Sequence, residues 1–384
     1  MEIYLDNSAT TKPNKEVVEI MLKALTDAFA NPSSLHRKGV EVEKLIKTAR
    51  KQLSRALAVK SEEIFFTSGG TESNNLAILG AVEARKRQGN RIITTKIEHP
   101  SVLNVYNHLE KQGYDVIYLD VDQFGKIDLD ELKEHLNDTT ILISIMHINN
   151  EVGTIQPIEE IGELLKDCTK KPIFHVDAIQ SFGKIKFSPA KMGIDLISIS
   201  SHKIHGPKGV GALYVNKSCK INPIAYGGNQ EAGMRSGTEN VPGILGFGVA
   251  ANALNIELDE KINKMWTLKN SFMEKIKEIE HIKVNGFEGE GSAPHIVNIS
   301  FLGVRGEVLL HSLEQEGIYV STGSACSSKK NSGSHVLKAM KMKPDEIEGA
   351  IRFSFSYNNE IKEIDYAVDK IEKYVLDLRK IMKR

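Results

Sequence analysis

The sequence has few cysteines, and their spacing suits no structural role. Among 384 residues there are three cysteines, Cys168, Cys219 and Cys326, which lie far apart and form no C-x-x-C pair. Disulfide-stapled domains and cysteine zinc sites need several closely spaced thiols. We therefore expect neither a disulfide framework nor a metal site, and each cysteine has to be interpreted singly.

The chain also lacks an excess of charge of one sign and long apolar runs. Lys and Arg together number 50, as do Asp and Glu, so no positive field favours nucleic acid or an anionic membrane surface. No 18 consecutive apolar residues occur, and the start Met1-Glu-Ile-Tyr4 has no basic stretch followed by an apolar one. These features predict a cytoplasmic protein that binds neither nucleic acid nor membrane.

What the sequence does contain is a regular alternation of strand-like and helix-like segments. Runs rich in β-branched residues predict strands, and helical patterns begin between them near Pro100, Leu129 and Pro157. The predicted strands occupy residues 64–67, 91–95, 116–119, 141–146, 173–176, 196–200 and 210–215. This alternation is typical of an α/β fold with a mostly parallel sheet, whose ligand lies at the carboxyl ends of the strands.

One lysine stands just after such a strand. Between the strands 196–200 and 210–215 lies a segment rich in Gly, Pro, Ser and His that contains Lys203. Desolvation and neighbouring cations lower the pKa of an amine, which makes a lysine a nucleophile toward a carbonyl carbon. The alternative is an ordinary surface lysine, so the interpretation of Lys203 depends on the other strand ends.

A glycine-rich turn joins the strand 64–67 to the helix that follows. Its sequence is Ser68-Gly-Gly-Thr-Glu-Ser-Asn74, which is neither a Walker A loop nor G-x-G-x-x-G. Backbone N–H groups at a helix start bind phosphate, and Gly70 and Thr71 are the candidates here. The alternative is a helix start capped by Ser68 or Thr71.

Polar side chains follow several other strands, and we expect them to meet Gly70, Thr71 and Lys203 at one rim of the sheet. They are Glu98, His99, His147, Asn149, Asn150, Glu151, Asp177 and Gln180. This combination of side chains suits pyridoxal 5′-phosphate. Its aldehyde needs a lysine, its phosphate needs N–H and hydroxyl donors, and its ring nitrogen needs a carboxylate. The predicted cofactor is therefore pyridoxal 5′-phosphate.

The motifs at these places also resemble those of a known family. In chain order they are LDNSATT at 5–11, NPSSLH at 31–36, FTSGGTESNN at 66–75, HINNEVG at 147–153, HVDAIQ at 175–180, SSHK at 200–203, RSGT at 235–238 and SAC at 324–326. This ordered set spans nearly the whole chain and is similar to that of the cysteine desulfurases, which depend on pyridoxal phosphate and are class-V aminotransferase-like. The loop after Cys326 resembles that of the long-loop branch.

The resemblance implies a fold and a domain division. The fold would be a fold-type I pyridoxal-phosphate-dependent transferase, with a large, mostly parallel α/β domain over residues 14–253. Residues 1–13 and 254–384 would form a smaller α+β domain. The smaller domain would carry Cys326 on a Ser- and Gly-rich segment that we expect to be an exposed, mobile loop. Lys329 and Lys330 in that segment would favour the thiolate, or simply solvate the loop.

The resemblance also implies a role for each candidate residue around the cofactor ring. Lys203 would bind the cofactor aldehyde, Asp177 would pair with the ring nitrogen, and His99 would stack on the ring and assist proton transfer. Gln180 and Asn150 would meet the ring oxygen or the substrate. Lys203, His99 and Cys326 would thus be the catalytic residues.

The remaining roles concern the phosphate and the substrate carboxylate. Thr238 would reach the phosphate from the second subunit of a homodimer, and Arg352 would take the substrate carboxylate with its planar fork. For Arg352 a structural ion pair is the alternative. Within one chain, the phosphate would be bound by Gly70, Thr71, Ser200 and His202.

The implied reaction converts L-cysteine to L-alanine and leaves the sulfur as a persulfide on Cys326. A sulfur-acceptor protein would then receive it, for iron-sulfur cluster assembly or tRNA thiolation. A selenocysteine lyase, an aminotransferase or a non-catalytic sulfur-transfer scaffold subunit are the alternatives, and Cys326 on its loop disfavours the aminotransferase. A nicotinamide-dependent dehydrogenase is disfavoured because no G-x-G-x-x-G follows a first strand.

Overall fold

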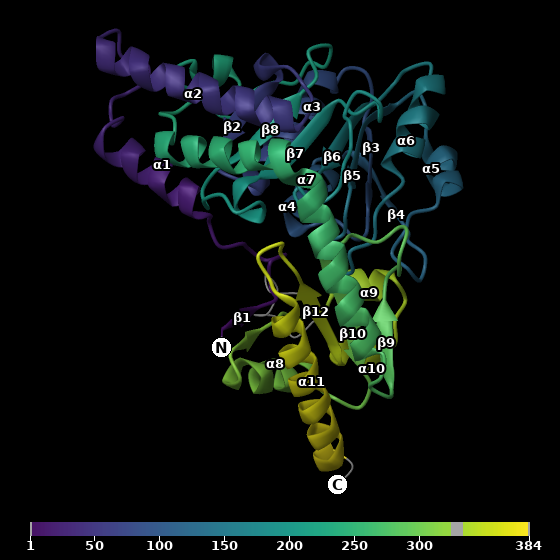
Figure 1. Cartoon of the computed structure of the whole chain (residues 1–384). Helices are drawn as coiled ribbons and strands as arrows, with labels where there is room; N and C mark the ends of the chain where they lie inside the picture. Colours follow the sequence, from purple (N-terminus) through teal and green to yellow (C-terminus); the bar gives the residue numbers. More distant parts are fainter. Residues whose placement is uncertain (1, 324–332, 383–384) are drawn as a thin grey trace.

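The computed structural model describes residues 2–323 and 333–382, which form a large and a small unit joined by one long helix (Figure 1). The large unit contains a seven-stranded sheet, in which only β8 runs antiparallel to its neighbours. Its strand order is β2 (Ile64–Thr67), β8 (Gly211–Val215), β7 (Leu196–Ser200), β6 (Ile173–Asp177), β5 (Thr140–Met146), β3 (Arg91–Thr95) and β4 (Asp115–Leu119). The predicted α/β fold with a mostly parallel sheet is confirmed.

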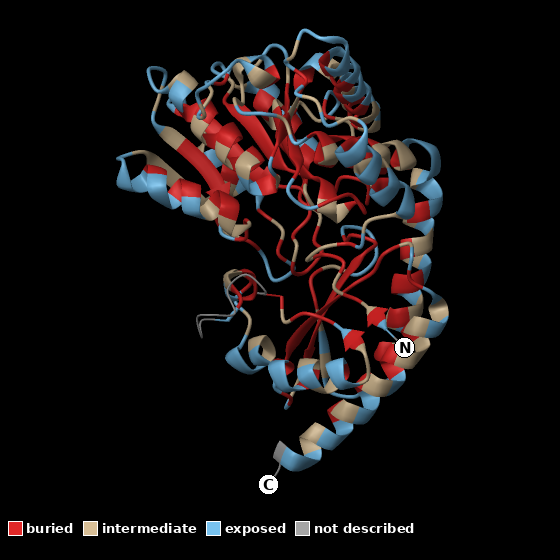
Figure 2. Cartoon of the chain, turned by 90° about the vertical axis from the view of Figure 1, so that its left-hand side faces the viewer, coloured by how far each residue is buried: buried red, intermediate tan, exposed pale blue. Residues whose placement is uncertain are grey.

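Helices cover both faces of this sheet because its strands alternate their side chains between two cores. Leu196 packs in a cluster with Leu76 and Tyr106, from α3 (Gly70–Arg85) and α4 (Pro100–Lys111). Its neighbour Ile197 packs in the opposite cluster with Ile46 of α2 (Arg37–Ala56). The central strands are therefore buried on both faces, as the red strands of Figure 2 show.

Short helices complete the large unit. They are α5 (Leu129–His135) and α6 (Ile158–Leu164), with 3₁₀ turns at Ser61–Glu63, Leu165–Asp167, Ser201–Lys203 and Gln230–Gly233. The turn Ser201–Lys203 directly follows β7, so Lys203 lies just beyond the carboxyl end of a strand, as predicted.

The small unit is built on an antiparallel sheet with the strand order β12 (Ala350–Ser354), β10 (Ile296–Phe301) and β9 (Ile282–Asn285). The N-terminal strand β1 (Ile3–Tyr4) pairs in parallel with β11 (Ile318–Tyr319). One cluster that contains Leu5, Phe301 and Phe353 forms the core of this unit. Its helices are α8 (Gly306–Gln315), α9 (His335–Ala339), α10 (Pro344–Glu348) and α11 (Ile361–Met382).

The helix α7 (Val241–Ile276) joins the two units. Its first half packs against α1 (Lys15–Thr26) and α2, while Phe272 near its end belongs to the core of the small unit. Among the described residues it is the one helix long and apolar enough to cross a membrane, yet 56% of its apolar window is buried inside the protein. The domain boundary predicted at 253/254 falls inside α7, just before Glu257, whose backbone leaves the helical conformation.

Candidate active site

A cavity of about 320 Å³ lies between the two units, at the carboxyl ends of the parallel strands. The large unit supplies most of its wall, and Ser8, Gly323 and Arg352 come from the segments of the small unit. The cavity brings together nearly all the predicted site residues of the described chain, namely Gly70, Thr71, His99, Asn150, Asp177, Gln180, Ser200, His202, Lys203 and Arg352.

Lys203 points its amine into this cavity from the turn after β7. Its Nζ donates to the carbonyl oxygens of Ser8 and Ala9, at 2.8 Å for Ala9. These carbonyls lie 195 and 194 positions away in the sequence. The N-terminal segment therefore reaches back from the small unit and fixes the position of the lysine.

Asp177 ends β6 and is 5% exposed. Its Oδ1 accepts from the backbone N–H of Ile179 at 3.0 Å, and its Oδ2 accepts from Asn74 Nδ2 at 2.8 Å. Burial raises the pKa of this carboxyl, while His99, these two hydrogen bonds and Lys203 act in the opposite direction. A cationic partner in the cavity would hold the group ionised.

His99 stands at the N-terminus of α4 as its cap. Its Nδ1 accepts from the backbone N–H of Ser101 at 3.1 Å and lies 2.8 Å from Ser101 Oγ. Burial lowers the pKa of His99. Asp177 raises this pKa, whereas Lys203 and His335 lower it. The surroundings of His99 therefore favour its neutral ring.

The glycine-rich turn leaves the first N–H groups of α3 without a side-chain cap. Gly69 is the N-cap and has φ 152°, a conformation that favours glycine, and no side-chain cap bond is formed among the described residues. The capping alternative for Ser68 and Thr71 is therefore wrong. A side chain at Gly70 would also collide, because an added Cβ would lie 2.2 Å from Ile179 Cδ1.

Two further side chains complete this end of the cavity. The hydroxyl of Ser200 is buried without a hydrogen-bond partner among the described residues. His202 Nδ1 lies 3.2 Å from Thr10 Oγ1, and burial together with Lys203 and Lys208 lowers the pKa of His202 to about 4. Uncapped N–H groups and an unpartnered hydroxyl suit an anionic ligand.

Arg352 lines the cavity from β12 and is 3% exposed. It donates to Asp6 Oδ1 at 2.7 Å and to the backbone oxygen of Asn150 at 2.9 Å, while its Nε is buried without a partner. Beside it, Gln180 Nε2 donates to Ser8 O at 3.0 Å. The ion pair that is the alternative role of Arg352 is thus present, and its Nε has no partner among the described residues.

Some predicted residues lie elsewhere. Glu98, His147 and Asn149 are buried and do not line the cavity, so the expectation that they share its rim is wrong. Their side chains belong to the interior beneath the strand ends. Thr238 lines a separate hollow with Ser68, on another side of the glycine-rich turn. Cys326 lies outside the residues that the structure describes.

Sequence reasoning missed several residues of the cavity. Ser8 and Ala9 hold the amine of Lys203 through backbone carbonyls, which carry no side-chain signal. Asn74 stands inside the motif FTSGGTESNN without a signal of its own, although it donates to Asp177. His335 lines the cavity, and its Nε2 donates to the backbone oxygen of Glu98 at 2.9 Å. Only its position shortly after Cys326 hints at its place.

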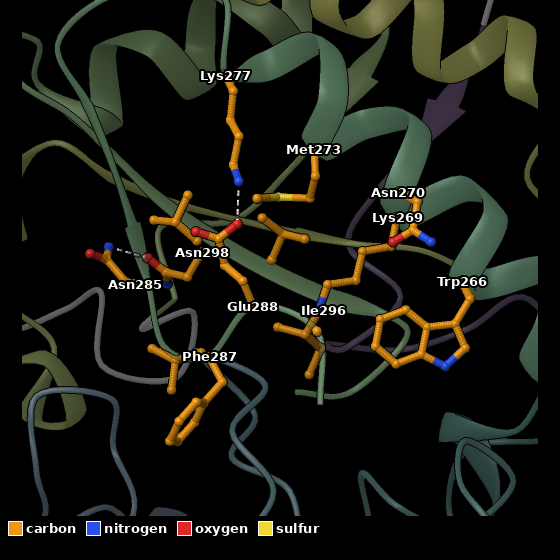
Figure 3. Close-up of a pocket in the computed structure, with 14 residues that line it drawn as sticks. Trp266, Lys269, Asn270, Met273, Lys277, Asn285, Phe287, Glu288, Ile296 and Asn298 are labelled. Atoms are coloured by element: carbon orange, nitrogen blue, oxygen red, sulfur yellow. Dashed lines mark hydrogen bonds and ion pairs between the residues drawn. The ribbon is translucent and has the colours of Figure 1, made fainter. Parts of the chain in front are cut away.

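A second cavity of about 220 Å³ lies in the small unit between α7 and the strands β9 and β10 (Figure 3). Trp266, Lys269 and Met273 line it from the helix. Lys269 donates to Ser292 Oγ at 2.9 Å and to Ala293 O at 2.7 Å, and burial lowers its pKa to about 7. The predicted site residues within 2–323 and 333–382 do not line this cavity.

Comparison with known proteins gives consistent matches over nearly the full length. The family model described as Aminotransferase class-V matches residues 3–367. A protein of Dictyoglomus turgidum named cysteine desulfurase IscS is 45% identical over 99% of this chain and 96% of its own length. A solved NifS-like protein has a TM-score of 0.92 at 39% identity, covering 98% of this chain and 100% of its own. A structure titled SspA in complex with cysteine has a TM-score of 0.82 at 35% identity, covering 93% of this chain and 100% of its own.

Proposed function

The chain belongs to the cysteine desulfurases of the class-V aminotransferase family, and we propose that it performs their reaction with Lys203, Asp177, Arg352 and Cys326. This assignment of residues rests on the cavity, which Asp177 and Lys203 line from the ends of two neighbouring strands and Arg352 lines from the small unit. The substrate is L-cysteine and the product is L-alanine.

Members of this family depend on pyridoxal 5′-phosphate, and the residues present fit that cofactor. The uncapped start of α3 and the unpartnered Ser200 hydroxyl offer donors for its phosphate. Asp177 offers a buried carboxylate to its ring nitrogen, and Lys203 offers an amine to its aldehyde. When bound, the cofactor supplies an electron sink for the charge that develops at the substrate Cα. Gly70, Thr71, His202 and Gln180 would complete its binding site.

Arg352 orients the substrate. Its guanidinium is buried with an unpartnered Nε, so a substrate carboxylate would satisfy the remaining donor beside the ion pair with Asp6. Asn150 lines the same part of the cavity. The amine of Lys203 would then move the proton at the substrate Cα, because it is the basic nitrogen that the cavity holds in reach of Asp177 and Arg352.

Cys326 takes the sulfur. Its thiolate would attack the substrate sulfur, so that a sulfur–sulfur bond forms as the substrate Cβ–S bond breaks. The electron pair left on the substrate takes up a proton, which gives alanine and a persulfide on Cys326. Gly323, three positions before Cys326 in the sequence, lines the cavity.

A homodimer is part of this proposal. The helix α1 exposes an apolar stripe at helical spacing, with Leu22 at 61% and Leu25 at 63% exposure. Thr238 lies outside the cavity of its own chain, as a residue that serves the second subunit would. The persulfide would pass from this dimer to a sulfur-acceptor protein that serves iron-sulfur cluster assembly or tRNA thiolation.

The three cysteines provide the test of this proposal and its controls. Cys326→Ser should keep the visible absorbance of the bound cofactor and lose persulfide formation from L-cysteine, because only the acceptor sulfur is removed. Cys168→Ser and Cys219→Ser change thiols outside the cavity and should keep full turnover. Undiminished turnover by Cys326→Ser would show that another group accepts the sulfur.

A further inference from the structure

A chain of hydrogen bonds links Asp177 to His99 through two side chains that have no role in the proposal so far. Asn74 Nδ2 lies 2.8 Å from Asp177 Oδ2 and 2.9 Å from Ser101 Oγ. Ser101 Oγ lies 2.8 Å from His99 Nδ1, and the backbone N–H of Ser101 donates to the same nitrogen at 3.1 Å. Asn74 is fully buried and Ser101 is 8% exposed.

The donor and the acceptor of each hydrogen bond in this network follow from the groups at its two ends, the carboxylate of Asp177 and the ring of His99. A carboxylate accepts, so Asn74 turns its NH₂ group toward Asp177, even though its Oδ1 is then buried without a partner among the described residues. The same NH₂ group donates to Ser101 Oγ, which leaves the Ser101 hydroxyl proton to point at His99. The backbone N–H of Ser101 can only donate as well, so His99 Nδ1 receives two donors.

We propose that Asn74 and Ser101 are positioning residues that hold neutral His99 in the tautomer with its proton on Nε2. A nitrogen that accepts two hydrogen bonds carries no proton, and the other ring nitrogen must carry it. His99 therefore offers a hydrogen-bond donor to the cavity and does not accept a proton at Nε2. This inference rests on the proposed function and narrows it, because the transfer of the substrate proton then falls to Lys203 alone.

The charged and titratable groups around His99 are consistent with this arrangement. Asp177 on β6 favours a protonated ring, whereas Lys203 after β7 and His335 on α9 disfavour it, and burial disfavours it most. Protonation at Nδ1 would also place the ring N–H of His99 opposite the backbone N–H of Ser101, and two donors repel each other. Loss of the Ser101 hydroxyl donor should make protonation of His99 easier.

The test uses the holoenzyme with ¹⁵N-labelled histidine, and the His99 signals are assigned by their absence in His99→Gln. In the wild type, neutral His99 should carry its proton on Nε2.

Ser101→Ala should raise the pKa of His99 by about half a unit to one unit, which corresponds to the loss of one hydrogen bond. Ser101→Thr keeps the hydroxyl and should retain the wild-type pKa. Asn74→Ala should shift the pKa upward as well, and Asn75→Ala is its matched control, since Asn75 Nδ2 donates to Thr71 O at 2.8 Å, away from Asp177 and Ser101.

A proton on Nδ1 of neutral His99 in the wild type would overturn the inference, as would an unchanged His99 pKa in Ser101→Ala. A purely structural Ser101 would lower stability without moving this pKa. Alanine formation from L-cysteine is measured on the same samples, so a failure of the proposed function is recorded separately from a wrong tautomer.

Discussion

Glu98 carries a carboxyl group in the interior directly before His99. It accepts from Thr95 Oγ1 at 2.9 Å and from the backbone N–H of Met146 at 2.8 Å, and its Oε2 is buried without a partner among the described residues. Burial raises the pKa of Glu98 to about 8, and the negative charge of Asp177 adds to this effect. The folded protein therefore keeps a proton on Glu98 that the unfolded chain releases near its ordinary pKa.

Glu98 should contribute to the pH dependence of stability. A raised folded-state pKa gives stability that is complete below the unfolded pKa and is lost as the pH rises toward about 8. Replacing the acid by an amide in Glu98→Gln should remove up to about 1.4 kcal/mol per pH unit of this dependence between roughly pH 5 and pH 8. Urea unfolding at three pH values measures it. The exposed Glu134→Gln is the control, and equal slopes in wild type and Glu98→Gln would refute a neutral Glu98.

The proposed role of Arg352 requires the planar guanidinium group, which a lysine cannot replace. Arg352→Lys keeps the charge but loses the geometry that pairs with Asp6, the Asn150 carbonyl and a substrate carboxylate at once. We expect KM for L-cysteine to rise about 10- to 100-fold, with the bound cofactor retained. Arg305→Lys changes an exposed pair with Glu348 and should leave KM alone. An unchanged KM in Arg352→Lys would remove Arg352 from the substrate site.

At the scale of elements, the strands could be predicted from the sequence because β-branched runs bounded by turn residues depend on local preferences. Arg91–Thr95, Leu196–Ser200 and Ile296–Phe301 lie where such runs occur. The continuity of α7 across the predicted boundary at 253/254 could not be predicted, because charged residues such as Glu257 look like the end of the large domain. Each half of α7 belongs to the unit against which it packs, and that packing is not visible in the sequence.

The packing of α7 on α2 depends on a close approach at Gly248. A Cβ there would lie 2.7 Å from both Cα and Cβ of Ala49. Gly248→Ala should lower the free energy of unfolding by about 1–3 kcal/mol, since overpacking outweighs the gain in helix propensity. Urea denaturation followed by circular dichroism measures the change. Ile256→Ala alters a side chain that is 74% exposed on the same helix and should change stability little. A more stable Gly248→Ala would contradict the tight contact.

At the scale of the whole molecule, the site is assembled from parts that are far apart in the sequence. Motif order predicted which residues gather around the cavity, because parallel strands bring their carboxyl ends to one edge. Backbone contacts such as those of Lys203 with Ser8 and Ala9 could not be predicted, since they depend on how the N-terminal segment crosses from the small unit. The inward burial of Glu98 likewise depends on its neighbours in space, whereas His99 beside it lines the cavity.

The proposed dimer can be tested at its apolar stripe on α1. Leu22→Glu combined with Leu25→Glu places two charges where the second subunit would pack, so we expect sedimentation as a monomer. We also expect weaker retention of the cofactor, because the proposed contact of Thr238 with the phosphate in the second subunit would be lost. Leu376→Glu, at a position 48% exposed on α11, is the control. A doubly substituted chain that remains dimeric would place the interface elsewhere.

We propose that Cys326 receives the sulfur of L-cysteine at a cavity built around Lys203. The most direct measurement is single-turnover reaction of the holoenzyme with L-cysteine, in which alanine is counted and the transferred sulfur is located by mass spectrometry of peptides. We expect one alanine to form for each additional sulfur atom on the peptide that contains Cys326. Alanine that forms while this peptide gains no sulfur would contradict it.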